Sequence, residues 1–220
     1  MVRFHISKKD DEDSIETDSK SNVDLEINVV ESTEERKEKE KKMIDGIFAF
    51  QNRTFGTVAE MIIRKKYGLS KETKDQHHDA TDSNGNRIEI KFSKGLKKNK
   101  KTLTEDNFLD DAIYSSMHHR ALSHDNYHVE PFDLNIQQVK VSEFDEMYYG
   151  IFFIDKVAVF KVKSEDVKNI EGYSDFQQKG NKGEGQFHLN TNTIDYHMKN
   201  HFAEWIEYSE VYEMFSEEDA

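Results

Sequence analysis

Three charged side chains within residues 77–93 have the types and the spacing for metal-assisted hydrolysis. Asp79 is followed ten residues later by Glu89, and Lys91 stands two residues beyond Glu89. On a β-strand, residues two apart point to the same face, so Glu89 and Lys91 would share one face while Ile90 points into the core. Two carboxylates offer oxygen ligands to a hard divalent cation, and a neighbouring ammonium group can orient a water molecule or a phosphate. The pattern therefore indicates phosphodiester hydrolysis with a divalent cation.

A hairpin is predicted to bring these residues together. Asn84-Gly85 separates two extended segments, and apolar and polar residues alternate along residues 87–92, as in a half-buried strand. A two-residue turn at Asn84-Gly85 would pair Asp79 with Ile90 and turn it away from Glu89. We therefore predict either a β-bulge or a hairpin loop with an odd number of residues (an odd-count connection). Either would turn the Asp79 side chain to the same face as Glu89.

The motif Asp79…Glu89-Ile90-Lys91 resembles that of the PD-(D/E)XK nuclease superfamily, in particular its type II restriction endonucleases. The resemblance includes an acidic residue, Glu60, on a preceding helix and covers residues 54–93; beyond them it is architectural only. His78 stands where the family often has a proline. The resemblance implies an α/β fold, with a mixed central β-sheet flanked by helices in a restriction-endonuclease-like core.

The resemblance also implies roles for single residues. Asp79 and Glu89 would hold Mg²⁺ together with the carbonyl of Ile90, and Lys91 would orient or activate water. Glu60 would approach the metal directly or through water, or else face solvent or pair within its helix. The expected phosphate contacts are Ser93, Lys94, Lys97 and Lys98. The implied partner is double-stranded DNA, cut by a homodimer because two symmetric strands need two active sites.

The charge of the chain is unevenly distributed. The net charge is −13, but residues 62–101 carry +7 and residues 102–220 carry −15. A basic segment at the position of the motif is consistent with a polyanionic partner. For DNA to bind, the acidic groups must lie mainly away from the cleft, and we predict a strongly polarised surface.

Other site chemistries find less support in the sequence. The absence of Cys excludes disulfides, thiolate zinc sites and a cysteine nucleophile. The ten His residues include no His-Glu-x-x-His motif, so they do not predict a zinc site. No apolar run is long enough for a membrane span, and the sequence predicts a cytoplasmic protein with no organic cofactor.

The chain divides into two parts by composition. Residues 1–42 are highly charged and are predicted to be a largely disordered tail, while residues 43–220 would form the nuclease domain. The periodicity predicts helices over residues 54–67, ending at Gly68, and 106–119, and strands over residues 132–141, 147–154, 156–162 and 186–190.

Base readout is the least defined part of the prediction. Gln186, Asn190 and Asn192 follow a glycine-rich segment, and amide side chains make bidentate contacts to adenine. The alternative is that they belong to a mobile hairpin without a binding role.

The predicted function is sequence-specific double-strand DNA cleavage by a type II restriction enzyme. Two alternatives stay open. One is a repair, recombination or phage nuclease of the same superfamily, and the other is a non-enzymatic acidic interaction protein, such as a DNA mimic, which the overall charge favours.

Overall fold

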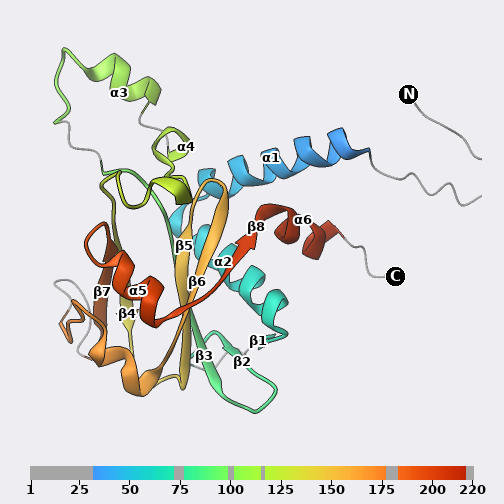
Figure 1. Ribbon diagram of the computed structural model, residues 1–220, viewed down its shortest axis with the longest axis vertical. Coiled ribbons are helices and arrows are strands. Elements are labelled where there is room, and N and C mark those ends of the chain that lie inside the picture. The colour runs from blue at the N-terminus through green and yellow to red at the C-terminus, as the bar shows by residue number, and fades with distance from the viewer. Residues whose placement is uncertain (1–31, 72–76, 99–101, 115–116, 177–182, 217–220) are drawn as a thin grey trace, which may run out of the picture. The chain divides into compact units, whose positions relative to one another are not determined.

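The centre of the fold is a mixed β-sheet (Figure 1). The computed structural model describes residues 32–71, 77–98, 102–114, 117–176 and 183–216, and within them the sheet has six strands in the order β1-β2-β3-β5-β6-β8. Neighbouring strands are antiparallel except β3 and β5, which are parallel. The strands are β1 (Ser70–Lys71), β2 (Ala80–Thr81), β3 (Arg87–Lys94), β5 (Glu146–Phe152), β6 (Lys156–Lys163) and β8 (Phe202–Glu207).

The two most apolar strands occupy the interior of this sheet. β5 is buried from its second residue onward, and β6 is buried over most of its length. This confirms the prediction that residues 147–154 and 156–162 form central strands. The predicted strands at 132–141 and 186–190 also form, but they pair with each other in a separate antiparallel ribbon, β4 (Asp133–Val139) with β7 (Gly185–Asn190).

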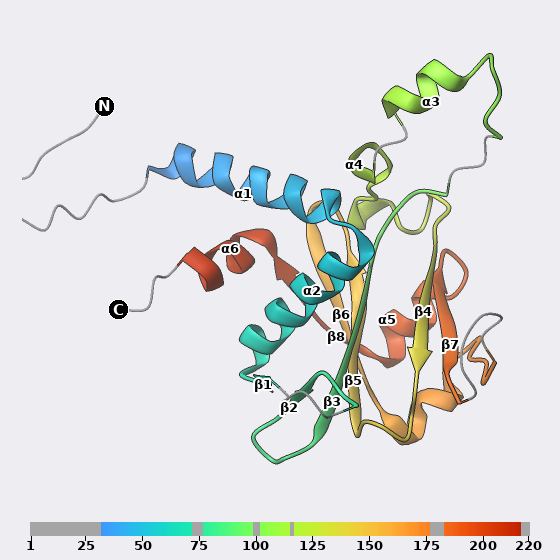
Figure 2. The ribbon, with the colours of Figure 1, turned by 180° about the vertical axis from the view of Figure 1, so that it is seen from behind.

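Three helices cover one face of the sheet, and Figure 2 shows them on the side opposite the β4–β7 ribbon. They are α1 (Thr33–Ala49), α2 (Asn52–Tyr67) and α6 (Tyr208–Ser216). Ile88 and Ile90 of β3 join the apolar cluster that these helices bury. As predicted, α2 ends at Gly68, whose φ of 63° is in the left-handed region that favours glycine.

The other face is covered by the β4–β7 ribbon, α5 (Ile194–Asn200) and the short 3₁₀ helix η2 (Ser164–Asn169). Its core is aromatic, with Tyr149, Phe160 and Phe187 fully buried. The buried His197 ring lies among them, and its Nδ1 is 2.9 Å from the Tyr149 hydroxyl. Burial lowers the pKa of His197 to about 4, so the imidazole is neutral at neutral pH.

The segment between β3 and β4 is helical over much of the range 106–119 for which one helix was predicted, and residues 115–116 lie outside the described residues. It contains α3 (Phe108–Tyr114), α4 (Met117–Arg120) and the 3₁₀ helix η1 (His124–Asn126). The apolar side of α3 is exposed: none of its residues is buried, and Phe108, Leu109, Ile113 and Tyr114 are each more than half exposed. Periodicity identifies an apolar helix face but does not say what covers it.

The first described helix crosses the boundary at residues 42/43 that the composition suggested. α1 is continuous from Thr33 to Ala49, so residues 33–42 are helical and the expected boundary at 42/43 falls inside a helix. Ion pairs between Arg36 and Glu40 and between Lys42 and Glu38 support its charged half, and Arg36 also contacts Glu213 of α6. The predicted tail up to residue 31 lies outside the described residues. None of the described helices has the length and apolar character to cross a bilayer.

Gly150 tests the packing of the sheet. A Cβ at this position of β5 would lie 2.1 Å from the Ala158 carbonyl oxygen and 2.3 Å from the Phe92 ring. Gly150→Ala should therefore lower the free energy of unfolding by about 3 kcal/mol or more, the upper range of overpacking. Gly56→Ala in α2 is the matched control, because nothing lies within 4 Å of its added methyl group. It should stabilise the protein by about 0.5–1 kcal/mol in the same urea titration. Equal stability of Gly150→Ala and the natural protein would contradict this packing.

Candidate active site

The β2–β3 hairpin has an odd-count connection, one of the two arrangements that the sequence predicted; the other was a bulge. Thr81 pairs with Arg87 and Ala80 with Ile88, so residues 82–86 form the connection, and Asp79, just before β2, lines the same cavity as Glu89. The carboxylate of Asp82 holds this loop by accepting hydrogen bonds from the backbone N–H groups of Asn84 and Asn86, at 2.8 and 2.9 Å. The prediction that Asp79 turns toward Glu89 is confirmed.

Asp79, Glu89 and Lys91 meet in one cavity of about 390 Å³. Lys91 Nζ forms a close ion pair with Glu89 Oε1 and lies 3.9 Å from Asp79 Oδ2. Asp79 Oδ2 also accepts a hydrogen bond of 2.8 Å from the Ile90 N–H, which fixes the orientation of this carboxylate. The cavity is lined by His77, His78, Asp79, Glu89, Lys91, Gln138, Lys140, Glu143 and Glu184.

The Ile90 carbonyl points toward the same edge of β3 as Asp79. The Ile88 carbonyl accepts a hydrogen bond of 3.0 Å from the Asp79 N–H. Backbone carbonyls two residues apart on a strand point to the same edge, so the Ile90 carbonyl also faces the β2 side. The Ile90 side chain, in contrast, is buried in the core beneath the helices. The backbone oxygen is therefore directed toward the side of the cavity where the predicted metal ligands lie.

Burial sets the electrostatics of the cavity. Glu89 is only 7% exposed, and this burial raises its pKa to about 7; Lys91 opposes the shift, and the charge of Asp79 adds to it. Burial also disfavours the Lys91 ammonium, but Glu89 and Asp79 outweigh that effect and raise the pKa of Lys91. The raised pKa favours the ammonium form of Lys91, which can act as a cation beside the two carboxylates.

Glu60 stands apart from this group. It accepts an ion-pair contact from Arg64 one turn later on α2, at 3.2 Å, and it does not line the cavity. Its charge nevertheless contributes to the raised pKa of Lys91. Of the roles considered for Glu60, the structure shows pairing within its helix together with an electrostatic influence on Lys91.

The predicted phosphate contacts divide into exposed and buried residues. Ser93 lies two residues beyond Lys91 on the same face of β3 and is partly buried. Lys97 and Lys98 lie at the surface, where their Nζ atoms are 3.7 Å from Glu130 and 3.8 Å from Asp133. These two lysines are available to a polyanion only in competition with carboxylates.

Lys94 was predicted to contact phosphate, but its side chain is buried on the other face of the strand. Its side chain points to the opposite face of β3 and is 7% exposed. The ammonium group donates hydrogen bonds to the carbonyls of Phe48, at 2.9 Å, and Phe50 at the end of α1, and lies 5.0 Å from the centre of the Phe55 ring. Lys94 therefore fixes the α1–α2 connection, because strand alternation directs residue 94 away from the face of Glu89 and Lys91.

The amide side chains predicted to read bases form hydrogen bonds within and next to the β4–β7 ribbon. Gln186 accepts a hydrogen bond from Asn135 at 2.8 Å and donates one to the Phe176 carbonyl at 3.2 Å. Asn190 Oδ1 accepts hydrogen bonds from the backbone N–H groups of Asn192 and Thr193 in the turn before α5. Gln186, Asn190 and Asn192 do not line the cavity, and their role in base readout stays a prediction.

Four lining residues come from segments that the sequence did not connect with the motif: Gln138, Lys140, Glu143 and Glu184. Gln138 has a φ of 57° at an irregularity of β4, an unfavourable conformation for a residue other than glycine. Glu184 precedes β7 and is 3% exposed. Only the packing of the ribbon against the sheet brings these residues to the site, so no local pattern could have revealed them.

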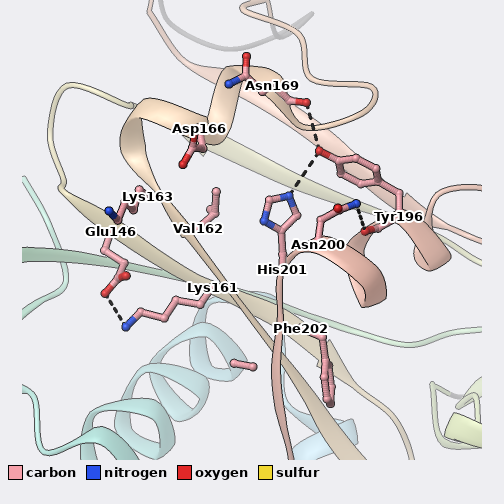
Figure 3. Close-up of a pocket in the computed structure, with 11 residues that line it drawn as sticks. Glu146, Lys161, Val162, Lys163, Asp166, Asn169, Tyr196, Asn200, His201 and Phe202 are labelled. Atoms are coloured by element: carbon pink, nitrogen blue, oxygen red, sulfur yellow. Dashed lines mark hydrogen bonds and ion pairs between the residues drawn. The ribbon is translucent and has the colours of Figure 1, made fainter.

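A larger cavity, of about 660 Å³, lies between β6, η2 and the end of α5 (Figure 3). Its polar groups contact one another: Lys161 pairs with Glu146 at 2.8 Å, and the Tyr196 hydroxyl donates to the Asn169 carbonyl at 3.2 Å and lies 3.4 Å from His201 Nε2. None of the predicted site residues lines this cavity, so it does not belong to the candidate active site.

Among the described residues, one group of three side chains is compact enough to hold a metal ion: His124, Asp125 and Asp155. The two carboxylates contact opposite nitrogens of the His124 ring. Asp155 also accepts hydrogen bonds from the Ser123 hydroxyl and the His124 N–H, as a cap of η1 does. Glu89 lies beside the start of β5, whereas this group lies beyond the other end of that strand. Its ligand atoms do not indicate which metal ion it would bind.

No protein-family model and no curated protein matches this chain. The functional assignment therefore depends on the geometry and electrostatics of the site.

The raised pKa of Glu89 predicts a pH-dependent stability in the absence of metal. Because folding raises this pKa from 4.5 to about 7, protonated Glu89 contributes stability that is complete below pH 4.5 and is lost as the pH rises through 7. In EDTA, the natural protein should lose about 2 kcal/mol of unfolding free energy relative to Glu89→Gln between pH 5 and pH 8. Urea titrations at the two pH values measure this loss. A difference that is independent of pH would contradict the burial of Glu89.

Proposed function

We propose that this protein is a divalent-metal-dependent nuclease of the PD-(D/E)XK superfamily that hydrolyses DNA phosphodiester bonds. The observation that carries the proposal is the convergence of Asp79, Glu89 and Lys91 in one cavity. A simple two-residue hairpin would have separated Asp79 from the other two. The odd-count connection of the hairpin therefore provides support that the sequence spacing alone does not.

The donor groups at the site fit Mg²⁺, which prefers oxygen ligands. Asp79 and Glu89 would hold it, with the Ile90 carbonyl directed to the same edge of the strand. When bound, such a cation polarises the phosphate and lowers the pKa of a coordinated water. The Ile90 N–H orients the Asp79 carboxylate in advance. Lys91, kept as an ammonium, would hold the attacking water or a phosphate oxygen beside the two carboxylates.

The charges around the cavity support a requirement for metal. Its described lining has four carboxylates, on Asp79, Glu89, Glu143 and Glu184, but only two ammonium groups, on Lys91 and Lys140. A phosphodiester would be repelled by this excess of negative charge unless cations were bound. DNA binding and metal binding should therefore be coupled at this site.

Within this activity we propose sequence-specific double-strand cleavage by a type II restriction enzyme acting as a homodimer. A repair, recombination or phage nuclease would use the same residues on other DNA structures. A non-enzymatic acidic protein would need no buried Glu-Lys pair in a cavity, and this pair weighs against it. Sequencing the ends of digested DNA would separate specific from non-specific cleavage.

Cleavage of mixed-sequence plasmid and phage DNA in Mg²⁺ tests the proposal. Asp79→Asn, Glu89→Gln and Lys91→Met should each lower the cleavage rate by about 10³-fold or more, because loss of a metal ligand or cation costs several kcal/mol at about 1.4 kcal/mol per tenfold. Glu146→Gln and Lys161→Met are matched controls, because they form a second Glu-Lys pair on the same sheet outside this cavity. The controls should cleave at the natural rate.

A binding measurement separates the metal site from the choice of substrate. Calorimetric titration with Mn²⁺ should show binding to the natural protein and to the two controls, and a loss of binding in Asp79→Asn and Glu89→Gln. Cleavage that all three site variants retain would refute the site. Metal binding without cleavage of any DNA or RNA would refute the nuclease function while leaving the metal site in place.

A further inference from the structure

The helix α3 exposes an apolar surface that a short helix cannot support alone. None of its seven residues is buried, and Phe108, Leu109, Ile113 and Tyr114 are 51–67% exposed. Isolated helices of this length are not stable in water, because nucleation costs more than a few hydrogen bonds return. Leu103, just before the helix, is also 62% exposed. Residues 102–114, here named the arm, therefore have the character of a surface that packs against a partner.

The charge of the arm indicates the kind of partner. Glu105, Asp106, Asp110 and Asp111 give it four negative charges, and its described residues include no Lys or Arg. DNA would be repelled by this surface. The partner that fits is a protein surface with an apolar centre and a basic rim.

This chain has such a surface between α1, α2 and α6. An almost wholly apolar groove of about 410 Å³ is lined by Lys42, Met43, Gly46, Ile47, Phe50, Val58, Met61, Ile62, Val211 and Phe215. Phe50, Met61 and Phe215 are 38–48% exposed. The groove is therefore an apolar surface that the described part of the chain leaves uncovered.

Two lysines stand at the margins of the groove. The Lys42 side chain is 72% exposed, and its nearest carboxylate is Glu38 on the same helix, at 3.4 Å. Lys65 follows Met61 and Ile62 on α2, and its Nζ lies 5.0 Å from the centre of the Phe215 ring. An acidic, apolar helix such as α3 is complementary to this groove in both charge and polarity.

We propose that the arm of one copy of the protein docks in the α1/α2/α6 groove of a second copy. No residue of the arm lines the groove, and Figure 1 and Figure 2 show α3 apart from α6, so in this structure the arm does not occupy the groove of its own chain. A twofold axis would make two identical arm–groove contacts and close the assembly as a dimer. This pairing does not depend on the proposed nuclease activity, and it names the surface through which the expected homodimer forms.

Cysteine cross-linking tests this pairing directly, because the chain has no Cys of its own. Ile113→Cys places one thiol on the arm, and Met61→Cys places one in the groove. After mild oxidation, a mixture of the two variants should give a disulfide-linked dimer on a non-reducing gel, at least about tenfold more than either variant alone. Val129→Cys, at a position that is 75% exposed and lies in neither surface, is the matched control and should not cross-link to Met61→Cys.

Two further measurements distinguish docking of the arm in a second copy from docking in its own chain. Leu109→Lys should halve the solution mass measured by light scattering and abolish the cross-link, with its secondary structure by circular dichroism unchanged because Leu109 is 67% exposed. A monomeric natural protein at 50 µM, or a mixture that does not cross-link, would overturn the proposal. A double variant, Met61→Cys with Ile113→Cys, that closes a disulfide within one chain would also overturn it. None of these readouts requires DNA cleavage, so they stand or fall separately from the proposed function.

Discussion

The pairing register of β2 with β3 is the constraint on which the candidate site depends. Thr81 lies opposite Arg87, and this alignment brings Asp79, the residue before β2, into the same cavity as Glu89. A shift of one residue would turn Asp79 to the other face, since side chains alternate along a strand. The hydrogen bonds of Asp82 to Asn84 and Asn86 define the loop that fixes the register. Local loop chemistry therefore determines whether the carboxylates converge.

The two faces of β3 have different environments: one packs against the helices, and the other lines the polar cavity. Its even-numbered side chains, including Ile88 and Ile90, anchor the strand against the helices, and Lys94 on the same face holds the end of α1. Its odd-numbered side chains carry the polar groups of the cavity. Because β5 runs parallel beside it and is almost entirely buried, β3 is held firmly where Glu89 must be placed. The free-energy cost of burying Glu89 is offset in part by its ion pair with Lys91.

The β4–β7 ribbon makes the cavity out of this polar face. It lies on the side of the sheet opposite α1 and α2, and it brings Gln138, Lys140 and Glu143 near Asp79 and Glu89. The same ribbon engages Gln186 and Asn190 in its own hydrogen bonds. The negative charge that dominates the later part of the chain thus also reaches the site, where a cation would have to balance it.

The sequence by itself determined the elements that depend on local periodicity: α2 with its stop at Gly68, the two central strands, and the strand that carries Glu89 and Lys91 on one face. It also predicted a bulge or an odd-count connection in the hairpin, because the alternation of side chains would otherwise turn Asp79 away from Glu89. Tertiary structure alone decided the burial of Lys94, the exposure of α3 and the arrival of Glu143 and Glu184 at the cavity. The physical reason is that periodicity fixes the direction of a side chain relative to its own element, whereas its neighbours depend on contacts between segments far apart in the chain.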